Sequence, residues 1–183
     1  MLKTLFGRRR RCEEAAHDLY AALVAQARRI EFYTRLQVAD SIDGRFDMVV
    51  LNAFLVLRRL GGEDGEAKDL AQALFDLMFA DFDQCLREMG VTDMGMSPKI
   101  KKMAKAFYGR VAAYEMAFAT DGQGLAEALG RNLYRGHETA EGVQEAMAAY
   151  MLAQFESLKT QATADLLAGK VAFIDPILPP EAA

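Results

Sequence analysis

The sequence predicts an all-α protein, a single-domain bundle of about six helices with a buried central helix near residues 45–60. Helix formers such as Ala, Leu, Met, Glu and Arg are abundant, while proline occurs only four times. Apolar side chains recur at steps of three or four residues, which is the period of an amphipathic helix. No stretch alternates apolar and polar residues as a half-buried strand would. With 183 residues, 52% of them hydrophobic, the chain can form one domain with a substantial core.

The first predicted helix spans residues 13–36 and is followed by the turn-rich loop QVADSIDG. The second spans about residues 45–60 and is apolar at every position from 46 to 57 except Asp47 and Asn52. A helix that is apolar on all sides is a buried one, and this one is too short to cross a bilayer. We therefore expect it at the centre of the bundle.

The third predicted helix spans residues 63–89, begins with several acidic residues and ends at Gly90. The connector VTDMGM then leads to Ser97 and Pro98, which suit the N-cap and the first turn of a fourth helix over residues 98–119. The buried face of this fourth helix is predicted to carry Ile100, Met103, Phe107, Val111, Tyr114 and Phe118.

Two more helices are predicted, over residues 125–134 and 139–167, the second ending at a glycine. The tail VAFIDPILPP is bounded by prolines and should be extended, either packed as a strap or docked on another molecule. The chain thus divides into a basic N-terminal segment over residues 1–11, a helical domain over residues 12–170 and a C-terminal tail over residues 171–183.

The cysteines and the N-terminal sequence indicate in which cellular compartment the protein is expected. Cys12 and Cys85 are far apart and form no CxxC pair, so we expect neither a disulfide framework nor a metal site, and free thiols fit a reducing compartment. No apolar run reaches the roughly 18 residues needed to span a bilayer. The start MLKTLFGRRRRC places charge where a signal peptide needs its apolar core. We expect a cytoplasmic protein.

Catalytic signatures are sparse. His17 and His137 are the only histidines, and the chain has no HExxH motif, no nucleophile elbow and no glycine-rich phosphate loop. Paired carboxylates such as Asp81 and Asp83 do not recur with histidines in the Glu-x-x-His pattern of di-iron bundles. We predict a binding protein without a catalytic site, metal or cofactor.

Charge is segregated along the chain, because residues 62–93 carry nine acidic residues against two basic ones, and residues 99–110 carry five basic and none acidic. Cations in the first turns of a helix oppose its macrodipole. We therefore predict a docking patch for an anionic partner, namely lipid headgroups, RNA phosphate or an acidic protein face. Its charged residues are Lys99, Lys101, Lys102, Lys105 and Arg110, and its apolar contacts are Phe107, Tyr108, Met94 and Met96. The alternative is a solvated face paired with the acidic helix.

The N-terminal segment carries a second basic cluster. Arg8, Arg9, Arg10 and Arg11 follow the apolar Phe6. A short apolar tip with adjacent basic residues binds anionic lipid weakly and reversibly, so we predict a membrane-surface contact here. The alternative is a solvated terminus.

Three residues of the central helix are predicted to have structural roles: Asn52, Arg45 and Phe46. Asn52 interrupts an otherwise apolar stretch, and a buried amide without hydrogen-bond partners costs about 1–3 kcal/mol. We expect Asn52 to tie the helix to a neighbour rather than to bind a ligand.

Several segments, taken in order, resemble the ubiquinol–cytochrome c chaperone family. The segments are DGRFDMVVLNAFLVLRRL at 43–60, LFDLMFADFD at 74–83, LREMGV at 86–91, KIKKM at 99–103, AFYGR at 106–110 and NLYR at 132–135. The resemblance covers roughly residues 30–160. Each segment alone is modest, but their order and spacing together are fairly specific. Many relatives have a histidine in the first segment where this chain has Asn52, so no titratable role is expected there.

The resemblance implies a non-catalytic assembly chaperone for ubiquinol–cytochrome c reductase, respiratory complex III. Its expected client is nascent or newly inserted cytochrome b, or another complex III subunit, with contacts to the ribosome near the exit tunnel. It would act on the inner face of the cytoplasmic membrane as a peripheral protein and would not bind DNA. The residues themselves leave two rivals open. One is a bundle that binds a lipid, quinone or haem-like molecule in an apolar cavity bordered by Arg or Lys, and the other is a ribosome- or RNA-docking module.

Overall fold

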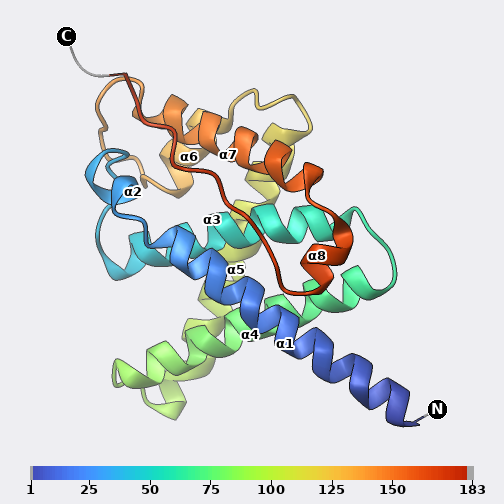
Figure 1. Cartoon of the computed structure of the whole chain (residues 1–183). Coiled ribbons are helices and arrows are strands. Elements are labelled where there is room, and N and C mark those ends of the chain that lie inside the picture. The colour runs from blue at the N-terminus through green and yellow to red at the C-terminus, as the bar shows by residue number, and fades with distance from the viewer. Residues whose placement is uncertain (1, 181–183) are drawn as a thin grey trace.

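The protein is described by a computed structural model that covers the backbone of residues 2–180 and the side chains of residues 7–180. This part of the chain contains eight helices and no strand, so the all-α prediction is confirmed (Figure 1). The helices are α1 (Leu2–Ala27), α2 (Ile30–Thr34), α3 (Ile42–Gly61), α4 (Glu66–Glu88), α5 (Asp93–Phe118), α6 (Leu125–Asn132), α7 (Val143–Thr160) and α8 (Thr163–Leu167).

Helix α3 lies at the centre, as its apolar sequence predicts, and packs against α1, α4 and α7. Its start is fixed by Ser41, whose hydroxyl accepts a hydrogen bond from Gly44 N at 3.1 Å. A Cβ added at Gly44 would lie 2.0 Å from the carbonyl oxygen of Ala39, so only glycine allows the preceding loop to approach this closely. Helix α5 is held to the bundle through α4 and α6.

The predicted first helix is wrong at both ends. Helix α1 already includes residues 8–11, because Arg9 and Arg10 pair with carboxylates one turn later, at 2.9 Å each, and Arg8 reaches α4. The chain then leaves the helix at Arg29, whose backbone is extended and whose guanidinium is held by Glu31 and Asp175. Helix α2 follows as a separate element.

The predicted start of the fourth helix is also wrong. Helix α5 begins at Asp93, so Pro98 lies inside it instead of in its first turn. Asp93 is an acidic residue in the first turn and pairs with Arg87 of α4 at 2.7 Å, which favours the earlier start. The helix continues through Pro98 without the one backbone hydrogen bond that proline cannot donate.

The predicted helix over residues 139–167 is divided into α7 and α8. Gly142, with φ of 79°, precedes α7 and delays its start. Arg59 of α3 separates the two helices by donating to the carbonyl oxygens of Leu158 and Gln161 and to the hydroxyl of Thr163. These donors satisfy carbonyls at the end of α7 that have no partner within the helix.

Residues 170–180 form the extended strap that was one of the two predictions for the tail. The red trace in Figure 1 runs back past α1 and α7. Gln26 of α1 donates to the carbonyl oxygen of Ile174 at 2.8 Å, and Ile174 N donates to Gln154 of α7 at 2.7 Å. Because the strap joins two helices that are far apart in sequence, it closes one side of the core.

Candidate functional site

The C-terminal end of α4 and the N-terminal end of α5 form a hairpin that projects from the rest of the bundle, at the lower left of Figure 1. Arg87 bridges the turn, with contacts of 2.7 Å to both Asp83 of α4 and Asp93 of α5. The predicted docking patch lies on this hairpin, along the first half of α5.

An aromatic seam holds the hairpin together. Phe107 of α5 packs against Phe75 and Phe79 of α4, with ring centroids 5.4 and 5.8 Å apart. Phe46 of α3 packs against Phe82 of α4 at 4.8 Å. Edge-to-face and tilted pairs of this kind add about 0.5–1.5 kcal/mol each beyond the area that they bury. Phe107 is therefore a buried core residue and not the exposed apolar contact that the docking prediction required.

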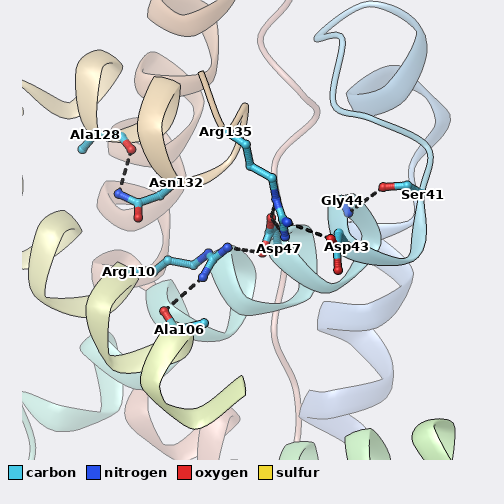
Figure 2. A network of polar contacts seen from close by, with 9 residues as sticks. All are labelled: Ser41, Asp43, Gly44, Asp47, Ala106, Arg110, Ala128, Asn132 and Arg135. Carbon is cyan, nitrogen blue, oxygen red and sulfur yellow. Dashed lines mark hydrogen bonds and ion pairs between the residues drawn. The ribbon is translucent and has the colours of Figure 1, made fainter. Parts of the chain in front are cut away.

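A buried ion network fixes the middle of α5 (Figure 2). Asp47 of α3 lies between two arginines: Arg110 Nη2 is 2.7 Å from Asp47 Oδ1, and Arg135 Nη2 is 2.9 Å from Asp47 Oδ2. Arg135, just after α6, also contacts Asp43 at 2.7 Å. Arg110 contributes a further hydrogen bond to its own helix, at Ala106 O. One carboxylate thus joins α3, α5 and the segment after α6.

The burial of Asp47 has an electrostatic consequence. Loss of hydration raises the pKa of Asp47 to about 6, although the charges of Arg110 and Arg135 act in the opposite direction. Arg110 is buried in this network and is unavailable to a docking partner, which differs from its predicted role. Asn132, near the network in Figure 2, does not join it and donates to Ala128 of its own helix.

The outward side of α5 carries the remaining predicted contacts. We call it the lysine face, and it consists of Lys99, Lys101, Lys102, Lys105, Met94 and Tyr108. Met94 is 93% exposed and Tyr108 is 58% exposed. Among the described side chains, the lysines that form ion pairs are Lys68 and Lys159, so the four lysines of the face have no carboxylate partner. The predicted alternative, pairing with the acidic helix, is not what the structure shows.

Helical geometry explains which predicted residues turn inward. Met96 is buried like Phe107 and Arg110, since all three lie on the side of α5 that faces the bundle. Sequence reasoning missed Met116, which is 74% exposed and lies two turns beyond Tyr108 on the outward side. The spacing of eight residues between Tyr108 and Met116 was the available signal.

The N-terminal arginines are largely compensated by carboxylates. Arg8 lies 3.3 Å from Glu66 and 2.8 Å from Asp69, both on α4, while Arg9 and Arg10 pair within α1. Arg11 is exposed. The side chain of Phe6 lies outside the described residues. These ion pairs reduce the positive charge that the run offers to a membrane.

Asn52 ties the central helix to its neighbours through a chain of buried hydrogen bonds. Its Nδ2 donates to Met48 O at 2.9 Å, and its Oδ1 accepts from the Tyr150 hydroxyl of α7 at 3.1 Å. Gln26 of α1 donates to the same hydroxyl at 2.9 Å. Of the other two predicted structural residues, Arg45 pairs with Asp40 on the surface and Phe46 joins the aromatic seam.

Over the described side chains, no three His, Cys, Asp or Glu residues group so that they could hold a metal ion. None of the helices in the described part of the chain combines the length and the apolar character that a membrane crossing requires.

A family model described as ubiquinol-cytochrome C chaperone matches residues 34–173, about three quarters of the chain. Curated relatives include ubiquinol-cytochrome c reductase complex assembly factor 1 of Mus musculus, 26% identical over 84% of this chain and 52% of the relative. Another is the mitochondrial protein CBP3 of Saccharomyces cerevisiae, 26% identical over 79% of this chain and 44% of the relative. The chain therefore spans about half the length of these relatives.

A solved structure extends the similarity to the fold. The crystal structure of the Cbp3 homolog from Brucella abortus superposes with a TM-score of 0.83 and is 38% identical in sequence. The match covers 96% of this chain and 97% of the other. The arrangement of helices described above is thus shared with that protein over almost its whole length.

Proposed function

The chain belongs to the ubiquinol-cytochrome c chaperone family, and on that premise we propose that it assists the assembly of ubiquinol–cytochrome c reductase as a non-catalytic chaperone. Relatives that it matches are named as assembly factors of this complex. The proposed client is newly made cytochrome b, which the chain would bind through the lysine face while in peripheral contact with the membrane.

The observation that carries the proposal is the lysine face itself. Four lysines that pair with no carboxylate among residues 7–180 stand beside two exposed apolar side chains on a projecting hairpin. Like charges three or four residues apart on a helix destabilise it by about 0.2–0.5 kcal/mol per pair. The spacings of Lys99 with Lys102 and of Lys101 with Lys105 are of this kind. Such a face adds nothing to the stability of the free protein, which supports a role in contact with a partner.

Because α5 begins earlier than predicted, the helix dipole no longer explains why the lysines are unfavourable for stability. The lysines were expected in the first two turns, where the helix dipole disfavours cations. Because α5 begins at Asp93, Lys99 lies more than one turn inside it, where this field has largely fallen off. Mutual repulsion among the lysines, not the dipole, is the remaining cost.

The rigid attachment of α5 also supports a docking role. The aromatic seam and the Asp47 network hold the inner side of the helix, so the outward lysines are presented without loss of conformational freedom in the backbone. A preorganised surface binds its partner more tightly, because less ordering is needed on association. Each lysine near an anionic membrane surface adds about 1 kcal/mol of attraction, which would favour contact beside a membrane-embedded client.

The direct test is copurification of cytochrome b with the affinity-tagged chain from gently solubilised membranes of cells making complex III. The variant has Lys99, Lys101, Lys102 and Lys105 all changed to Glu. The matched control changes four exposed cations elsewhere, Lys68, Arg131, Lys159 and Lys170, to Glu, so that net charge is the same. We expect cytochrome b with the wild type and the control and at least a tenfold loss with the variant. Equal recovery with the variant, or none with the wild type, would contradict the proposal.

A further inference from the structure

A cleft of about 570 Å³ opens between the C-terminal half of α3, the middle of α5 and α7. Its apolar lining includes Phe54, Leu57, Phe107 and Val111. Small-molecule sites typically measure about 300–1,000 Å³ and combine apolar walls with a few polar groups. The volume of the cleft therefore lies within the range of small-molecule sites.

Arg58 supplies the polar group of this cleft. Its guanidinium carbon lies 5.0 Å from the ring centroids of both Phe118 and Phe155. Cation–π contacts with two rings hold the guanidinium in place. Its Nε is buried and has no hydrogen-bond partner among the described residues. Burial lowers the pKa of Arg58, which means that the positive charge is poorly solvated where it stands.

The partner of this charge in the free protein is Glu115 of α5, whose carboxylate contacts Arg58 Nη1. The two groups differ in mobility, because the Arg58 side chain is 24% exposed and contacts two rings, whereas that of Glu115 is 43% exposed. Glu115 can turn toward water at little cost, while Arg58 cannot leave the rings without losing their contacts. The Glu115 carboxylate thus occupies a position that another anion can take.

We propose that this cleft binds an amphiphile with an apolar chain and a carboxylate or phosphate head. The chain would lie along Leu57, Val111 and Phe155, and the head would replace Glu115 on Arg58. Guanidinium matches both kinds of head with charge-assisted hydrogen bonds.

The test measures displacement of a dansyl-labelled undecanoic acid, which fluoresces more strongly in an apolar site, by three twelve-carbon competitors. Laurate and lauryl phosphate carry an anionic head, and lauryl alcohol does not. We expect both anions to compete at concentrations at least tenfold below the alcohol, and their relative strength identifies the preferred head. Equal competition by all three, or no binding of the probe, would overturn the proposal.

Four variants locate the site. Arg58→Gln should remove the preference for anions, and Glu115→Gln should strengthen anion binding about three- to tenfold by removing the internal competitor. Val111→Trp should block all three competitors by filling the cleft. Arg87→Gln, an exposed arginine that also pairs with carboxylates, is the matched control and should bind like the wild type. If Arg58→Gln unfolds, Glu115→Gln and Val111→Trp still test the site. Unchanged binding in both of these variants would contradict the assignment. The assay uses no cytochrome b, so its outcome is independent of the assembly role.

Discussion

Asp47 is the buried carboxylate on which two arginines converge, and its removal should be severe. Asp47→Ala removes the carboxyl oxygens that hold Arg110 and Arg135, and leaving one partner of a buried pair without the other costs about 3–5 kcal/mol. Denaturant titration followed by circular dichroism measures the loss in the free energy of unfolding. Asp43→Ala is the control, since Asp43 makes an exposed contact to the same Arg135 and should cost less than about 1 kcal/mol. Similar losses for both variants would contradict the role given to Asp47.

The raised pKa of Asp47 predicts a pH dependence with a definite sign. Between its ordinary value of 3.8 and about 6, the folded protein binds a proton that the unfolded chain does not. The stabilisation from this group is therefore complete below pH 3.8 and is lost as the pH rises through 6. Relative to Asp47→Asn, the wild type should gain about 1 kcal/mol between pH 7 and pH 5. A difference that stays constant, or that shifts against the wild type, would show that the pKa of Asp47 is not raised.

Single residues show what the sequence could and could not predict. Asp47 and Asn52 stood out as the two polar positions in an apolar helix, but Arg110, Arg135 and Tyr150 are distant in sequence and could be paired with them only by the fold. The periodicity that places Phe107 on the buried face of its helix also excludes it from the docking patch, to which the sequence analysis assigns it as an apolar contact.

At the scale of elements, helix ends were predicted less well than helix interiors. The splits between α1 and α2 and between α7 and α8 depend on the long-range contacts of Arg29 and Arg59. Local propensity contains no sign of such contacts, since the residues that interrupt the helices are ordinary helix formers. The start of α5 was placed too late because the pairing of Asp93 with Arg87 was not foreseen.

Arg59 provides an element-scale prediction. Arg59→Ala removes the donors that satisfy the carbonyl oxygens of Leu158 and Gln161 at the end of α7. We expect a loss of about 1–3 kcal/mol and faster amide hydrogen exchange in α8, because unsatisfied part-buried carbonyls carry that penalty. Hydrogen exchange read by mass spectrometry measures this. Arg45→Ala, which removes an exposed pair to Asp40, should leave α8 unchanged. Unaltered exchange in α8 of Arg59→Ala would contradict the account.

The lysine face gives a second prediction for an element. Changing Lys99, Lys101, Lys102 and Lys105 to Gln should leave the free energy of unfolding unchanged or raise it by up to about 1 kcal/mol. The reason is that repulsion between like charges is relieved and no ion pair is lost. Thermal and denaturant unfolding measure the change. A loss of more than about 1 kcal/mol would mean that the lysines stabilise the fold and are not free for a partner.

At the scale of the whole molecule, the acidic residues of α4 and the lysines of α5 do not form salt bridges with each other among the described residues. The lysines lie on the surface instead. The acidic helix α4 lies beside the basic helix α5, yet its carboxylates contact other groups. Asp69 pairs with Arg8, Asp81 accepts a hydrogen bond from Tyr20, and Asp83 pairs with Arg87. The sequence predicted the fold class, the central helix and the basic patch, because these follow from composition and periodicity. It could not predict which faces meet, and that arrangement decides which charges stay unpaired.

An assembly role exerted through the lysine face can be tested in cells that lack the gene. Assembled complex III is measured in their membranes by the haem b spectrum and by ubiquinol–cytochrome c reductase activity. We expect the complex to be lost in these cells. The wild type and the control with Lys68, Arg131, Lys159 and Lys170 changed to Glu should restore it, and the variant with Lys99, Lys101, Lys102 and Lys105 changed to Glu should not. Normal complex III in the deletion strain, or full rescue by that variant, would contradict the assembly role.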